Sequence, residues 1–156
     1  MTSESDEMDA LIAELPGGKA LIDWFGYIPR FHDAKLLGLH LGASGATLRL
    51  HTFRITSETD EKGYFLLDRH VVVTFTLERL TGIKLEGYAS QGILYGLNLR
   101  RYGSGDPLLG TEVVTMGVPP EPNDVGLQLD HTYGLWGVMY ARKMSISLAP
   151  GKPADS

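Results

Sequence analysis

The stretch Val71-Val72-Val73-Thr74-Phe75-Thr76-Leu77-Glu78 decides the fold of this chain. Every odd position in it is apolar, whereas the even positions are mostly threonine or glutamate. Alternation with a period of two residues is typical of a β-strand that buries one face, and β-branched and aromatic residues favour strands. We therefore predict a strand over residues 71–78 whose odd-numbered side chains face a hydrophobic core.

The same alternation recurs on both sides of this strand. Further strands are predicted over residues 37–41, 47–56, 83–89, 93–102, 125–133 and 135–148. The pattern changes face near His51-Thr52, which predicts a β-bulge there. Short turns separate most of the strands, so we expect antiparallel pairing, because parallel pairs need long crossovers. The predicted fold is mostly β (α+β), an antiparallel sandwich or a strongly curved sheet.

Two short helices are predicted ahead of the strands. Apolar residues fall at helical spacing over residues 8–15 and 18–26, and Pro16-Gly17-Gly18 interrupts them. These helices are expected to cover one face or one open end of the sheet. The predicted organisation is a disordered acidic N-terminus (1–8), a single globular domain (9–150) and a disordered C-terminal tail (151–156).

Charge and composition argue against several classes of function. Five of the 19 acidic residues lie within the first 14 positions, and the rest of the 156-residue chain balances 14 acidic against 14 basic residues. Without a basic face, no nucleic-acid partner is expected. No apolar run approaches the roughly 20 residues of a membrane span, and the acidic start is unlike a secretory signal. We therefore predict no membrane association and a cytoplasmic location.

The chain contains no complete catalytic or metal-binding motif. Cysteine is absent, which removes thiolate chemistry and zinc sites of the Cys type. His40 and His51 stand on neighbouring predicted strands, and such residues approach to about 5 Å across a ladder, but the spacing supplies no third ligand. In Phe31-His32-Asp33 the adjacent polar side chains point to opposite faces of an extended chain, so we expect them to anchor the backbone. No catalytic residue, metal site or cofactor is predicted.

Side chains suited to binding another protein occur in two places. Residues 57–63 are predicted to form a solvated hairpin loop with three carboxylates, and acidic groups steer association with a basic partner. Two tyrosines stand beside glycines at predicted strand ends, and an exposed tyrosine near arginine is typical of a binding hot spot. The predicted partner-binding residues are Glu58, Asp60, Glu61, Tyr88 and Tyr102.

The segment Trp24-Phe25-Gly26-Tyr27-Ile28-Pro29-Arg30-Phe31-His32-Asp33-Ala34-Lys35 resembles the opening signature of the immunity protein 50 family of bacterial polymorphic toxin systems. The family pattern has Trp, Gly and Pro, followed by Phe-His-Asp-Ala and an acidic residue. Arg30 stands here in place of a small residue, and Lys35 stands in place of the acid. The residues that the resemblance marks as a fold signature are Trp24, Pro29, Phe31, His32 and Asp33.

A second part of the chain is similar to the central hairpin of the same family. The matching residues are Val73-Thr74-Phe75, Gly82-Ile83, Leu85, Gly87-Tyr88 and Gln91-Gly92-Ile93, although Asn is more typical where Gly92 stands. The resemblance implies a mostly β protein without catalytic activity. It also implies that the protein neutralises a cognate bacterial toxin by binding it.

Three functions remain open on the sequence alone. The first is immunity-type binding, in which the acidic 58–61 hairpin, the irregular segment 103–124 or the acidic N-terminus occludes the active surface of a toxin. The second is a small-molecule-binding protein or an enzyme with a pocket under the curved sheet, for which His40, His51 and Tyr95 are candidate polar groups. The third is a subunit that forms a homodimer through exposed strand edges.

Overall fold

The computed structural model describes residues 4–43, 45–87, 93–103, 114–115, 121–133 and 136–153. Two short N-terminal helices precede a mostly β body, as predicted. The helices are α1 (Glu4–Glu14) and α2 (Gly18–Phe25). The strands are β1 (Lys35–Leu41), β2 (Gly45–Thr59), β3 (Phe65–Glu86), β4 (Ile93–Arg101), β5 (Val114–Thr115), β6 (Val125–Tyr133) and β7 (Trp136–Pro150).

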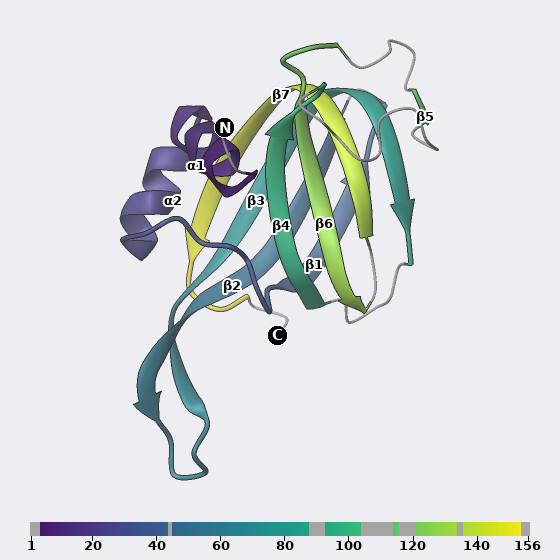
Figure 1. Ribbon diagram of the computed structural model, residues 1–156. Coiled ribbons are helices and arrows are strands. Elements are labelled where there is room, and N and C mark those ends of the chain that lie inside the picture. Colours follow the sequence, from purple (N-terminus) through teal and green to yellow (C-terminus); the bar gives the residue numbers. More distant parts are fainter. Residues whose placement is uncertain are drawn as a thin grey trace.

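Six strands pair antiparallel into one sheet that closes on itself (Figure 1). Their order is β2-β1-β4-β6-β7-β3, and β3 also pairs with β2, so the last strand meets the first. β5 adds two residues beside the second half of β3. β1 meets β4 at one residue pair, Lys35 and Ile93, and Leu94 N donates to Ala34 O just before it. The curvature predicted from the sequence is therefore strong enough to close the ring.

β3 is one continuous strand of 22 residues, whereas the sequence predicted separate strands over 71–78 and 83–89. It pairs with β2 over residues 65–78 and with β7 over residues 71–86, so residues 71–78 have a partner strand on both sides. A register shift between Leu80 and Gly82, with Arg79 at a positive φ of 59°, bends the strand between the two predicted segments. A bulge absorbs an extra residue without ending a strand, so Gly82 lies at a bend and not in a turn.

The core fills the inside of the ring and extends under the helices. The odd-numbered side chains Val71, Val73, Phe75 and Leu77 are at most 1% exposed, as their alternation predicted. They belong to the same buried cluster as Phe25 of α2. Burial of an apolar side chain of this size contributes about 1.5–3 kcal/mol, so this stretch of β3 is the centre of the folded body.

The acidic N-terminus, predicted to be disordered over residues 1–8, belongs in part to α1. Met8 is buried in the core, and Glu7 Oε1 accepts a hydrogen bond of 2.9 Å from Arg101 N at the end of β4. Glu14 forms an ion pair of 2.7 Å with the Arg101 guanidinium. The acidic residues of this segment therefore attach the first helix to the sheet, which is why the helix begins earlier than its apolar pattern does.

The turn between the two helices contacts an edge of β7 that β6 leaves open. β6 pairs with β7 as far as Val125 and Ala141. Beyond that pair, Ile146 N donates to Pro16 O at 2.8 Å. The helices thus lie against the side of the ring where β7 continues past β6 (Figure 1). Within the described parts of the chain, helices are all too short or too polar to cross a membrane.

The hairpin of β2 and β3 extends beyond the ring as a two-stranded arm (Figure 1). The ladder shifts register between Thr52 and Arg54, beside the position where the sequence predicted a bulge. The extra residue lies on β3, where Arg69 has a positive φ of 50°. We call residues 54–68 the hairpin arm. The bulge separates this arm from the part of the hairpin that belongs to the ring.

Gly137 in β7 leaves no space for a side chain. Its φ is 134°, and a Cβ there would lie 1.8 Å from Lys84 O on β3. We expect Gly137→Ala to lower the free energy of unfolding by about 2–4 kcal/mol, because the strands must separate and the backbone is strained. Gly38→Ala is the control, since a Cβ at Gly38 meets nothing within 4 Å. Urea unfolding measures both variants, and equal effects would contradict the close approach of β3 and β7.

Candidate functional site

The hairpin arm carries a concentration of exposed apolar side chains. Of the eight large hydrophobic residues that are exposed in the described chain, five lie on this arm. They are Ile55, Tyr64, Phe65, Leu66 and Leu67, with exposed fractions from 42% to 68%. Scattered exposed apolar residues are ordinary on protein surfaces, whereas a contiguous group marks an interaction site. The arm is therefore the strongest candidate for a functional surface.

The two faces of the arm differ in chemistry. Ile55 and Leu67 are direct cross-strand partners, and Phe65 lies on the same face because side chains alternate along a strand. On the other face, Arg54 Nε donates to Asp68 Oδ1 at 2.8 Å, and this bond lowers the pKa of the Asp68 carboxyl. One face thus carries three of the exposed apolar side chains, while the other carries Leu66 beside the ion pair that ties the two strands together.

The tip of the arm is a tight turn, because β2 continues to Thr59. Asp60 Oδ1 accepts hydrogen bonds from Lys62 N at 2.8 Å and from Tyr64 N at 3.0 Å. This carboxylate, predicted to contact a partner, therefore shapes the turn. The side chains of Glu58 and Glu61 are exposed. They remain the acidic groups of the tip that a partner can reach.

The root of the arm is bonded to two other parts of the molecule, and a histidine pair links its own two strands. Trp24 Nε1 of α2 donates to Arg69 O at 3.2 Å, and the Arg69 guanidinium donates to Trp24 O. Gly151 N, after β7, donates to His70 O at 2.7 Å. His51 Nε2 on β2 lies 3.0 Å from His70 Nδ1 on β3. These contacts fix the direction in which the arm leaves the ring.

The surroundings of the histidine pair at the root favour its neutral form. Burial lowers the pKa of His51 below its ordinary value of 6.5, and His70, Lys35 and Lys152 lower it further. Burial and Lys152 also lower the pKa of His70, while a backbone hydrogen bond and Asp68 act in the opposite direction. No sequence pattern predicts this pair, because the two residues meet only through the register of a long hairpin.

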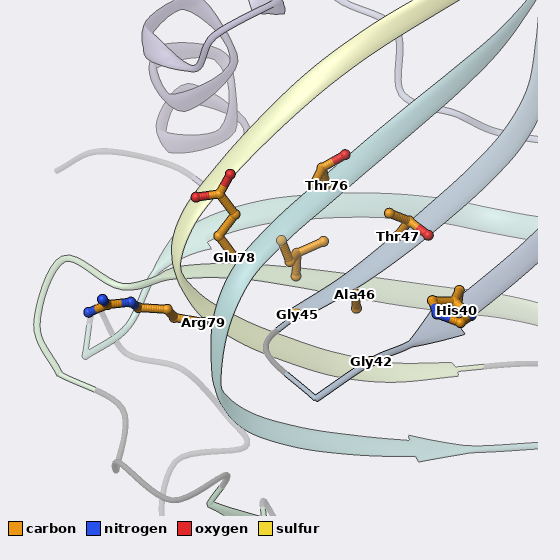
Figure 2. A pocket seen from close by; sticks show the side chains of 9 residues that line it. His40, Gly42, Gly45, Ala46, Thr47, Thr76, Glu78 and Arg79 are labelled. Atoms are coloured by element: carbon orange, nitrogen blue, oxygen red, sulfur yellow. The ribbon is translucent and has the colours of Figure 1, made fainter.

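A shallow cleft lies on the outside of β1, β2 and β3 (Figure 2). It has a volume of about 550 Å³ and is lined by His40, Thr47, Thr76, Glu78 and Arg79 among others. Figure 2 shows the Arg79 side chain extended away from His40. The cleft is open to solvent, so a small molecule bound there would stay partly exposed.

The polar groups predicted for a ligand pocket do not converge. In the ladder of β1 and β2, His40 faces Thr47 while His51 faces Lys35, so the predicted approach of His40 and His51 is wrong. Their strands are neighbours, but the register places the two histidines at opposite ends of the pairing. Tyr95 is 62% exposed on β4 and contacts His32 edge-to-face.

A buried carboxylate that the sequence did not single out lies at the start of β6. Asp124 accepts hydrogen bonds from Thr81 Oγ1 at 2.8 Å, from Glu121 N at 3.0 Å and from an Arg142 guanidinium nitrogen at 2.7 Å. The hydrogen bond and the charge of Asp124 raise the pKa of Arg142. Because several donors already occupy this carboxylate, the arrangement joins β3, β6 and β7 and offers little to a ligand.

The residues of the family-like signature hold the chain against β4 and the arm. The Phe31 ring is buried edge-to-face on Phe75 at 5.5 Å, and Pro29 is buried as well. His32 Nδ1 donates to Tyr95 O at 2.8 Å, and Asp33 N donates to Leu94 O at 3.0 Å. The other signature residue, Trp24, contacts the root of the arm.

Of the two predicted tyrosines, only Tyr102 lies in the described part of the chain. Tyr102 is half-buried, with its ring edge-to-face on Tyr140 at 5.1 Å. Tyr88 lies outside the described residues. Among the residues that the structure describes, no three His, Asp or Glu side chains are grouped to hold a metal ion.

Comparisons with family models, with curated proteins and with solved structures find no match to this chain.

The Asp124 cluster provides a stability test that is independent of the arm. We expect Asp124→Ala to lower the free energy of unfolding by about 3–5 kcal/mol, because it leaves the half-buried Arg142 without its principal carboxylate. Asp9→Ala removes an exposed ion pair of 2.7 Å with Arg30 and should cost less than about 1 kcal/mol. Denaturant unfolding measures both variants. A cost for Asp124→Ala as small as that of Asp9→Ala would show that the buried cluster does not hold the strands together.

Proposed function

We propose that this protein binds a partner protein through the hairpin arm, and that the partner is a cognate bacterial toxin whose active surface the arm occludes. The observation that carries the proposal is the group of five exposed apolar side chains on one projecting hairpin. The resemblance of residues 24–35 to the immunity protein 50 family supports the choice of a toxin as the partner.

The arm has the composition of a binding surface. Aromatic side chains bury about 150–250 Å² each, and Tyr64 and Phe65 are both more than half exposed. Aromatic anchors surrounded by aliphatic neighbours are typical of interface hot spots. A two-stranded hairpin is marginally stable on its own, so leaving such side chains in water brings the folded monomer no benefit. Burial against a partner explains why they are present.

The acidic side chains of the tip indicate the charge of the partner surface that would fit them. Glu58 and Glu61 flank the apolar group, with Lys62 as the basic residue between the tip and Tyr64. A partner that fits this surface has an apolar cleft with a basic rim. Enzymes that act on an acidic substrate have such a rim around the active site, and insertion of the arm would exclude the substrate from it.

A pair of substitutions on the apolar face tests the proposal directly. Phe65→Ser with Leu67→Ser should weaken binding to a candidate toxin domain, taken from a gene next to the one for this protein, by about 30-fold or more, as expected for hot-spot residues. Tyr95→Ser is the matched control, because Tyr95 is equally exposed but lies on β4. Growth rescue and calorimetric binding at pH 7.5 provide the measurements. Full rescue by the double variant, or equal losses in both proteins, would reject the arm as the binding surface.

The acidic tip should affect the rate of association. Glu58→Gln with Glu61→Gln leaves the turn-forming Asp60 in place, and we expect it to slow association several-fold at low salt, because charge steers encounter more than it sets affinity. The difference should disappear at high salt. Asp23→Asn with Glu78→Gln removes the same charge away from the arm and serves as the control in stopped-flow measurements. An association rate that the tip substitutions leave unchanged at low salt would contradict a basic partner surface.

A further inference from the structure

The arm leaves the ring at a joint whose two strands are linked by histidine. β2 contributes His51 and β3 contributes His70, with His51 Nε2 and His70 Nδ1 3.0 Å apart. On one side of this pair the ladder is regular from Thr52 inward, and on the other side it restarts out of register at Arg54. Arg69, with its positive φ, lies at the same level. The inter-ring bond is thus a side-chain link across the hairpin where the backbone register changes, on the ring side of the Arg54–Asp68 ion pair.

The proton content of this link is constrained by burial. Two neutral rings carry two protons on four nitrogens, and one proton lies between the rings. When it belongs to His51 Nε2, the buried His51 Nδ1 carries none, and this atom lacks a hydrogen-bond partner in the described structure. A third proton must occupy His51 Nδ1, where no acceptor meets it, or the second of the two facing nitrogens, where it breaks the bond. The neutral pair leaves one buried acceptor unpaired but keeps the inter-ring bond, whereas a third proton either breaks that bond or adds a buried N–H without an acceptor, which is costly.

The surroundings reinforce this preference. Lys35 on β1 and Lys152 after β7 both act against protonation of His51. Asp68 on β3 favours a charged His70, but its carboxylate is bonded to Arg54 on β2. α2 contributes the uncharged indole of Trp24 to the root. No described carboxylate therefore stands free to neutralise an added proton at this joint.

We propose that the His51–His70 pair is an acid-sensitive latch, which fixes the hairpin arm to the ring when neutral and releases it when protonated. Release follows from the proton count, because the inter-ring bond and an unpaired buried N–H cannot both be accommodated. Since both groups bind protons less readily in the folded root than in the open one, the latch is closed above the ordinary histidine pKa of 6.5 and opens as the pH falls below it. The biological consequence rests on the proposed function: a partner held by the arm is released in acid.

Hydrogen exchange of the protein alone measures the latch. Between pH 7.5 and pH 5.0, with intrinsic exchange rates corrected, we expect protection of arm amides over residues 54–68 to fall about tenfold, because an unlatched two-stranded hairpin is marginally stable. Protection of the central β7 amides should change much less. Equal changes in the arm and in β7, or an arm whose protection does not depend on pH, would overturn the proposal.

Two variants link the loss of protection to the histidines. In His70→Asn the amide oxygen can accept the His51 Nε2 proton without titrating, so the arm should stay protected at pH 5.0. Lys152→Gln leaves both rings in place but removes a nearby positive charge, so the midpoint of the loss should move to higher pH by a few tenths of a unit. Lys19→Gln on α2 is the charge control. A midpoint that Lys152→Gln does not move, or moves no more than Lys19→Gln does, would assign the pH dependence to another group.

The latch and the proposed function fail in different ways. Exchange needs no partner, so the latch is tested even if no toxin binds. Binding at pH 7.5, where the latch is closed, tests the partner proposal without the histidines. If binding at pH 7.5 holds but arm protection does not depend on pH, the latch alone is wrong.

Discussion

The pairing of β3 with two different strands is the constraint on which the rest of the structure depends. Residues 71–78 of β3 pair with β2 on one side and with β7 on the other, so this single strand closes the ring. The buried side chains of residues 71–77 belong to one cluster with buried side chains of both helices and of β2, β4, β6 and β7. Without the double pairing, the remaining strands would form an open sheet with exposed edges, and the helices would have no closed body to cover.

The same strand also places the proposed binding surface outside the body. β7 pairs with β3 only from Val71 onward. The residues of β3 before Val71 therefore extend past the ring together with the end of β2. The arm has no core beneath it, and its direction depends on contacts at the root. Those contacts come from α2, from the segment after β7 and from the histidine pair. The position of the proposed binding surface is therefore set by contacts that lie outside the arm itself.

The sequence patterns predicted those features of the fold that depend on the local spacing of apolar residues. The alternation of 71–78, the antiparallel pairing and the two helices follow from residue spacing. The continuity of β3 did not, because Gly82 is equally typical of a turn and of a bulge. The meeting of His51 with His70, and the separation of His40 from His51, depend on register over a long hairpin. On the arm, the apolar run Tyr64-Phe65-Leu66-Leu67 is visible in the sequence, but an apolar run by itself predicts a buried strand. Its exposure follows only from where the ring ends, which the sequence does not show.

Separation of the arm from the core has an evolutionary consequence. The exposed residues of the arm do not belong to the buried cluster, so substitutions there leave the packing of the body intact. Selection can then change the binding specificity of the proposed surface while the scaffold stays constant. We expect related chains to diverge fastest between the register shift and the tip, and to keep the inward positions of the same strand nearly unchanged. One continuous strand would thus show two rates of sequence change, with the boundary at the bulge.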